Sequence, residues 1–173
     1  MMAGRGASPA RSQRRSREGE GNDRVEQPDV SVVIATRDRP QHLAASVASV
    51  LASPADFELM VVDQSETSAT EQALAALAPD PRLRYRKSEQ RGLSRARNDG
   101  ISMTRAPLVA FTDDDCRPGP AWLQQLRATF AEVPEAALVF GRVIPPEDDP
   151  EPGYVSMFGP AERLVPDWRP RPH

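Results

Sequence analysis

The chain is poor in the residues that usually cross-link a protein or bind zinc. It contains one cysteine, Cys116, and two histidines, His42 and His173, among 173 residues. A single cysteine cannot form an internal disulfide, which fits a reducing compartment, and two scattered histidines do not make a zinc site. No histidine stands near Cys116 in the sequence to activate it as a nucleophile, so we interpret it as a small buried or half-buried side chain.

The sequence also lacks long apolar runs and a strong excess of charge of either sign. No apolar stretch approaches the length of about 20 residues that crosses a bilayer, and the first residues lack the apolar core of a secretory signal. The formal net charge of -3 gives no argument for nucleic-acid binding. We therefore expect a cytoplasmic protein with no transmembrane segment and no nucleic-acid partner, with a position at the inner face of the membrane as the alternative.

Apolar residues with a regular spacing are scarce at both ends of the chain. Residues 1–28 are rich in Gly, Ser, Arg and Pro, and such a composition predicts a disordered basic tail. We interpret this tail as a passive extension; the alternatives are contact with phosphates or an anionic membrane, or a transit peptide. Residues 144–173 are crowded with proline and predict a loop-rich segment or the start of a further unit. The length of the chain leaves room for one domain, at residues 29–143.

Strand-like and helix-like segments alternate within this domain. Apolar runs of strand length predict five strands, at residues 30–35, 57–62, 83–86, 108–112 and 137–140. Apolar residues at helical spacing predict four helices between them, which begin near Pro40, Thr67 or Ser68, Gly92 and Pro118 to Pro120. Strands that alternate with helices are typical of an α/β fold with a mainly parallel sheet and helices on both faces.

Three consecutive carboxylates, Asp113, Asp114 and Asp115, follow the fourth predicted strand. Ligands of open α/β sheets bind at the carboxyl ends of the strands, which is where this acid triplet lies. Adjacent carboxylates repel one another unless a positive charge lies among them, so the triplet predicts a divalent metal ion with oxygen ligands. The alternative is an acidic turn in water.

Polar residues also follow the first and second predicted strands. Thr36, Arg37 and Asp38 come after the first strand, and Asp63 and Gln64 come after the second. Because the carboxyl ends of parallel strands meet at one edge of a sheet, we expect these side chains to share a pocket with the acid triplet. The alternative for Asp63 is a cap on the following helix.

A basic segment opens the third predicted helix. Gly92 permits a tight entry into this helix, and the backbone N–H groups at its start can bind an anion. Arg97 follows one turn later and adds a guanidinium group suited to phosphate. The alternative is a basic helix face in water, an interpretation that fits Arg95.

Four segments of the chain together resemble the amino-terminal, nucleotide-binding half of the family 2 glycosyltransferases, which are inverting enzymes with the GT-A fold. They stand in the order and spacing of that family, at residues 30–39, 58–65, 92–101 and 111–116, with 120–123 behind the last. The resemblance implies a GT-A-like, Rossmann-like domain at residues 29–143 that binds a nucleotide sugar. It also implies metal-assisted transfer of the sugar, with inversion, from a UDP-linked donor to a saccharide or lipid-linked acceptor in polysaccharide biosynthesis.

The resemblance implies a role for each polar strand end. Residues at the nucleobase and ribose would be Thr36, Arg37 and Asp38. Asp63 and Gln64 would contact the uridine, although many family members have a second acid in place of Gln64. The nucleotide would also be approached by Arg97. In the family's DxD signature, Asp113 or Asp114 would lie near the ribose, and Asp115 together with Asp113 would hold Mn²⁺ or Mg²⁺.

The catalytic base is the part of the family pattern that the chain does not show. In the family this base is an acid well downstream of the DxD signature, so we expect it beyond His173 and interpret the chain as a truncated, donor-binding half. One alternative is a catalytically inactive nucleotide-binding fragment. A remote alternative is a phosphatase of the haloacid dehalogenase type. That family carries its D-x-D motif on the first strand, and follows it with Thr or Val where this chain has Arg117.

Overall fold

A four-stranded parallel sheet forms the centre of the protein, for which the computed structural model describes residues 27–144. The predicted basic tail and the proline-rich segment lie almost entirely outside the described residues. The strands stand in the order β3-β2-β1-β4, and the three pairings between them are parallel. Their bounds are β1 (Val30–Thr36), β2 (Phe57–Asp63), β3 (Leu83–Lys87) and β4 (Leu108–Asp113). The prediction of a mainly parallel sheet is therefore confirmed.

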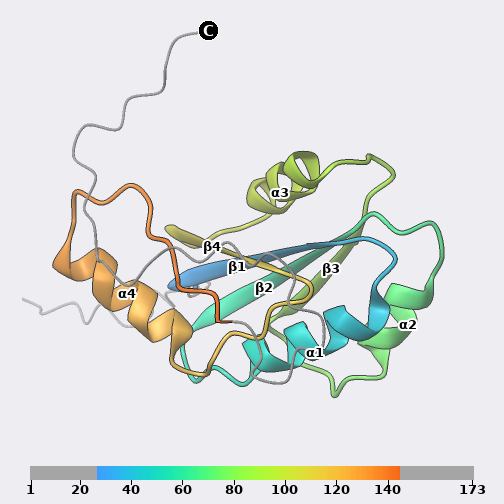
Figure 1. Ribbon diagram of the computed structural model, residues 1–173, viewed down its shortest axis with the longest axis horizontal. Helices are drawn as coiled ribbons and strands as arrows, with labels where there is room; N and C mark the ends of the chain where they lie inside the picture. The colour runs from blue at the N-terminus through green and yellow to red at the C-terminus, as the bar shows by residue number, and fades with distance from the viewer. Residues whose placement is uncertain (1–26, 145–173) are drawn as a thin grey trace, which may run out of the picture.

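Helices cover both faces of this sheet, as predicted. Helix α3 lies on one face, whereas α1, α2 and α4 lie on the other (Figure 1). The helix bounds are α1 (Pro40–Leu51), α2 (Ala69–Ala75), α3 (Leu93–Ser102) and α4 (Trp122–Glu132). Within residues 27–144, no helix is long and apolar enough to cross a membrane.

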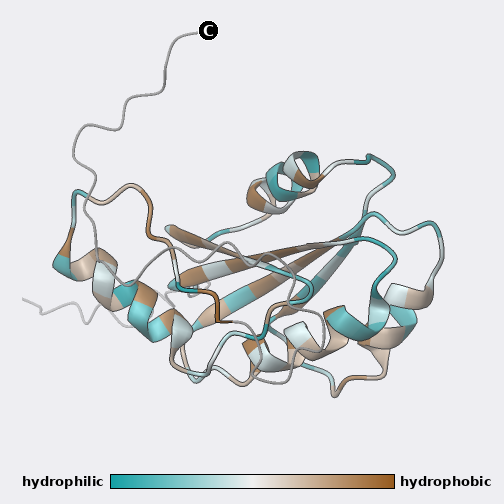
Figure 2. Ribbon diagram, viewed as in Figure 1, coloured by the Kyte–Doolittle hydropathy of each residue, from teal (hydrophilic) through white to brown (hydrophobic). Residues whose placement is uncertain are grey.

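The central strands β1 and β2 are buried because helices cover both of their faces. Both read as nearly continuous apolar runs, which is typical of parallel strands. Alternate residues point to opposite faces, so Val32 and Ile34 face the larger core beneath α1, whereas Val33 faces the smaller core beneath α3. Figure 2 shows the apolar residues along the strands, between the two helix layers.

Helix α3 approaches the sheet closely because its inner face carries two small residues. Ala96 and Gly100 are one turn apart and both are buried. A Cβ atom added to Gly100 would lie 2.4 Å from Cγ1 of Val33, closer than two carbon atoms can approach. The close packing places the next side chain, Arg97, near the end of β4, where it reaches Asp113.

The prediction of a fifth strand at residues 137–140 is wrong. The structure has no regular secondary structure there, and Leu138 is 67% exposed. An apolar run becomes a strand only where a partner strand accepts its backbone hydrogen bonds. Among the described residues, this run pairs with no strand of the sheet, and the sheet ends at β4.

Candidate functional site

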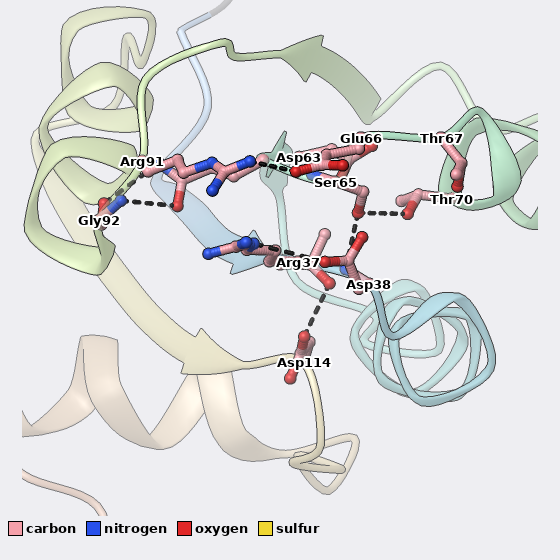
Figure 3. Close-up of polar contacts among 12 residues, drawn as sticks. Arg37, Asp38, Asp63, Ser65, Glu66, Thr67, Thr70, Arg91, Gly92 and Asp114 are labelled. Carbon is pink, nitrogen blue, oxygen red and sulfur yellow. Dashed lines mark hydrogen bonds and ion pairs between the residues drawn. The ribbon is translucent and has the colours of Figure 1, made fainter.

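The carboxyl ends of β1, β2 and β4 lie level with one another at one edge of the sheet. Thr36 is the register partner of Asp63, and Ala35 is the partner of Asp113. The polar residues that follow these strands therefore come together, as the sequence predicted. Figure 3 shows Arg37, Asp38 and Asp63 at this edge, with Asp114 below them.

The shortest contact of each aspartate in the acid triplet is with a different side chain. Asp113 accepts a hydrogen bond from Nη2 of Arg97 at 2.9 Å, and Asp114 accepts one from the hydroxyl of Thr36 at 2.7 Å. Asp115 lies 3.2 Å from Nη1 of Arg39. Only 9% of the Asp114 side chain is exposed, compared with 56% for Asp113 and 52% for Asp115. Asp114 therefore fixes the turn to β1, whereas the carboxylates of Asp113 and Asp115 are exposed.

The acid triplet does not form a ready-made metal cage. In the part of the chain that the structure describes, no three His, Cys, Asp or Glu side chains are grouped so that they could hold an ion. Mg²⁺ is usually held by one or two carboxylates together with waters and substrate phosphates. The exposed carboxylates of Asp113 and Asp115 fit an ion of that kind, which takes its remaining ligands from a substrate.

The backbone of the acid triplet is held by hydrogen bonds to the carbonyl oxygen of Asp113. It accepts the N–H of Cys116 at 3.1 Å and the hydroxyl of Ser46, on α1, at 3.1 Å. Cys116 is half-buried, as expected. Burial and the nearby carboxylates of Asp115 and Asp113 raise the pKa of the Cys116 thiol. The thiol therefore stays protonated at neutral pH, which speaks against its use as a nucleophile.

Asp63 is fully buried, and its carboxylate accepts three hydrogen bonds. The donors are the N–H of Ser65 at 2.8 Å, the hydroxyl of Tyr85 at 2.9 Å and Nζ of Lys87 at 3.1 Å. Burial alone would raise the pKa of Asp63, but the hydrogen bonds from Ser65, Tyr85 and Lys87 outweigh burial and lower it. Asp63 is thus a buried anion that anchors β3, and its contact with a uridine stays a prediction.

Tyr85 and Lys87 are site residues that the sequence analysis did not identify. They lie two and four residues after Leu83 on β3, so the three side chains point to the same face of the sheet. Lys87 is also the register partner of Asp63. The alternation is visible in the sequence, but the register that brings Lys87 beside Asp63 is not.

The side chain of Gln64 binds the backbone directly before α3. Its side-chain amide donates to the carbonyl oxygens of Gln90 and Gly92, and its Oε1 accepts the N–H of Gly92 at 3.2 Å. Gly92 has φ of 120°, which a residue with a side chain rarely adopts. The amide of Gln64 therefore binds backbone, and its predicted contact with a nucleobase is not tested by this geometry.

Arg37 and Asp38 directly follow β1, and their side chains are exposed. They form an ion pair at 3.4 Å, with 47% and 53% of their side chains exposed. Asp38 has φ of 57°, a left-handed conformation that is uncommon outside glycine. Its N–H donates to the hydroxyl of Ser65 at 2.7 Å, and this hydroxyl in turn contacts Thr70 (Figure 3).

The sequence of the chain matches a known protein family. The family described as Glycosyl transferase family 2 matches residues 31–171. The chain belongs to the family 2 glycosyltransferases. It is therefore a member of an enzyme family, the resemblance seen in the sequence is confirmed, and the phosphatase alternative is set aside.

Named relatives of this glycosyltransferase chain include proteins that are much longer. Validoxylamine A glucosyltransferase of Streptomyces hygroscopicus subsp. limoneus is 33% identical over 119 residues, which are 66% of this chain and 26% of the relative. Succinoglycan biosynthesis protein ExoU of Rhizobium meliloti is 30% identical over 152 residues, which are 79% of this chain and 40% of ExoU. The chain thus spans less than half the length of these curated relatives.

Solved structures confirm that the chain has a GT-A-like fold. Residues 1–349 of S. aureus TarS in complex with UDP-GlcNAc match with a TM-score of 0.56 and 22% identity, over 68% of this chain and 37% of that one. The mannosyltransferase PcManGT of Pyrobaculum calidifontis, in complex with GDP-Man and Mn²⁺, matches with a TM-score of 0.55 and 23% identity, over 62% and 33%. At these identities the likeness establishes the fold alone.

Proposed function

We propose that the chain binds the donor of an inverting, metal-assisted glycosyltransferase, which transfers a sugar from a UDP-linked donor to a saccharide or lipid-linked acceptor. The observation that carries this proposal is the level arrangement of three strand ends around two exposed carboxylates, Asp113 and Asp115. Two structural neighbours were solved in complex with a nucleotide sugar, UDP-GlcNAc in one and GDP-Man with Mn²⁺ in the other. These neighbours support a nucleotide sugar as the class of donor, but their donors differ in the nucleobase.

Each side of the site would bind a different part of the donor. The nucleobase and ribose would lie beside the carboxyl end of β1, where the side chains of Arg37 and Asp38 are exposed. The diphosphate would lie at the end of β4, where Arg97 contacts Asp113 and its guanidinium lies 5.6 Å from the centre of the Phe111 ring. A guanidinium group matches the geometry of phosphate oxygens, so Arg97 suits the negative charge of the donor.

The reaction needs stabilisation of the charge that develops on the leaving nucleoside diphosphate. A divalent ion, when bound, supplies this as a Lewis acid on the phosphate oxygens. Asp113 and Asp115 would hold it, while Thr36 keeps Asp114 turned inward and fixes the turn that carries both acids. This division of roles explains why the middle aspartate is buried and the outer two are exposed.

Acceptor binding and the general base belong, in this proposal, to a part of the enzyme beyond the matched region. The matched segments cover only 26% of the validoxylamine A glucosyltransferase and 40% of ExoU. The name of ExoU, a succinoglycan biosynthesis protein, supports a role in polysaccharide assembly.

Isothermal titration calorimetry with UDP tests the proposal. We expect binding that requires Mn²⁺ or Mg²⁺ and that is lost in Asp115→Ala. The control is Asp56→Ala, which removes an exposed carboxylate directly before the start of β2, at the opposite edge of the sheet. Binding of UDP without a metal ion, or unchanged binding by Asp115→Ala, would contradict the assigned site.

A further inference from the structure

Arg39 lies across two acids of the triplet, although the sequence analysis gave it no role. Its Nη1 atom is 3.4 Å from Oδ1 of Asp114 and 3.2 Å from Oδ2 of Asp115. The side chain is 55% exposed, so packing covers less than half of it. The polar contacts of its guanidinium group are with these two acids.

The backbone of Arg39 is fixed, and its side chain can move. Asp38, directly before it, is held in the left-handed conformation by its hydrogen bond to Ser65. The carbonyl oxygen of Arg39 accepts the N–H of Leu43 at 3.0 Å, which makes Arg39 the first residue of the α1 hydrogen-bond pattern. A movement of the guanidinium group therefore requires only side-chain rotation.

Both exposed acids of the triplet are paired with a guanidinium group. Arg39 pairs with Asp115, and Arg97 pairs with Asp113 at 2.9 Å. A divalent cation bound to Asp115 would stand beside the positive charge of Arg39 and would be repelled by it. The guanidinium group and a metal ion therefore compete for the same carboxylate.

We propose that Arg39 stays paired with Asp115 until a nucleotide binds, and that its guanidinium group then moves to the diphosphate of the donor. This inference rests on the proposed function. Guanidinium groups bind carboxylate and phosphate oxygens with the same fork geometry. Because metal–oxygen distances are about 2 Å, phosphate oxygens on an ion at Asp115 would lie roughly 3–4 Å from its carboxylate. Rotation of the Arg39 side chain spans that distance, so Arg39 makes binding of the ion depend on the nucleotide.

The experiment compares wild type with Arg39→Gln, which keeps a polar side chain and removes the charge. Electron paramagnetic resonance of free Mn²⁺ measures the affinity for Mn²⁺ without nucleotide, and calorimetry measures the affinity for UDP at saturating Mn²⁺. We expect Arg39→Gln to bind Mn²⁺ about 3- to 10-fold more tightly, because the ion no longer has to displace the exposed ion pair between Arg39 and Asp115. We expect the same variant to bind UDP about 10-fold more weakly, because the charged hydrogen bond from Arg39 to the diphosphate is lost.

Two further variants control for loss of folding and for a general charge effect. Arg39→Lys keeps the charge and should retain most of the dependence of Mn²⁺ binding on UDP. Arg127→Gln removes a guanidinium group that pairs with Asp29 at 2.9 Å, away from the site, and should change neither affinity. Circular dichroism confirms that each variant is folded.

The possible results separate this inference from the proposed function. If wild type does not bind UDP even with Mn²⁺, the proposed function fails. If wild type binds UDP with Mn²⁺ but Arg39→Gln binds Mn²⁺ alone no more tightly than wild type, only the role of Arg39 is overturned. Equal behaviour of the Gln and Lys variants would also overturn it, because the charge would then make no difference.

Discussion

The hydroxyl of Thr36 donates a hydrogen bond to the buried carboxylate of Asp114 at 2.7 Å, and so joins the end of β1 to the turn after β4. The two residues are 78 positions apart in the sequence. This bond explains why the middle member of the acid triplet is buried while the outer two are exposed. Thr36 therefore supports the site from within, in addition to any contact with a nucleotide.

Replacing Thr36 by valine should destabilise the protein and disorder the acid triplet. Val keeps the shape of Thr but removes the hydroxyl that donates to Oδ2 of the buried Asp114, which costs about 1–3 kcal/mol of unfolding free energy. Urea denaturation measures this loss. Thr36→Ser keeps the hydroxyl and should lose much less; an equal loss in both variants would show that the methyl group, rather than the hydrogen bond, matters.

Replacing Gly100 by alanine should also destabilise the protein, although alanine is the better helix former by about 1 kcal/mol. The new Cβ would lie 2.4 Å from Val33, and α3 would have to move away from the sheet. Overpacking of this kind typically costs about 1–3 kcal/mol. Chemical denaturation should show a net loss of stability.

Gly119→Ala is the matched control for Gly100→Ala. A Cβ added to Gly119 has no atom within 4 Å. We expect this variant to keep the stability of wild type. A stable Gly100→Ala variant would contradict the close approach of α3, and with it the placement of Arg97 over the end of β4.

Glu58 should make the stability depend on pH. It is buried near the start of β2 and accepts hydrogen bonds from the hydroxyl of Ser31 at 2.7 Å, the N–H of Arg105 at 2.6 Å and Nη1 of Arg84 at 3.2 Å. Burial alone would raise the pKa of Glu58, but the hydrogen bonds from Ser31 and Arg105 and the charge of Arg105 lower it. Its ionised form is therefore favoured by folding.

A lowered pKa in the folded state means that the stabilisation by Glu58 is complete above the ordinary pKa of 4.5 and is lost as the pH falls through the folded value. Glu58→Gln should be less stable than wild type by about 1–3 kcal/mol at neutral pH. The difference should shrink below the ordinary pKa. Urea denaturation at a series of pH values measures it, with the exposed Glu135→Gln as the control. A difference that is constant with pH would argue against an ionised Glu58.

The sequence predicted the strands and helices well because their apolar runs report burial directly. Val30–Thr36 and Phe57–Asp63 carry apolar residues on both faces, and only central parallel strands need them there. The meeting of Thr36, Asp63 and the acid triplet at one edge followed from the same parallel arrangement. The run at residues 137–140 looked similar, but its local composition could not show that a partner strand was absent from the described sheet.

The partners of each site residue could not be predicted from the sequence. Asp113, Asp114 and Asp115 are equivalent in the sequence, and only their side-chain directions separate the buried Asp114 from its exposed neighbours. Arg39, which reaches Asp115, directly follows Asp38, whose left-handed backbone conformation the sequence does not reveal. Contacts of this kind depend on tertiary geometry, which no local pattern specifies.

The most direct test of the account is a two-dimensional amide NMR spectrum of the protein recorded with UDP and with substoichiometric Mn²⁺. A paramagnetic ion broadens the signals of nearby amides, so the position of the ion can be read from the residues that lose intensity. We predict that the signals of Asp113, Asp114 and Asp115 are broadened first and that the signal of Asp56 is retained. Broadening centred elsewhere, or the same spectrum for Asp115→Ala, would contradict a metal-assisted donor site at the end of β4.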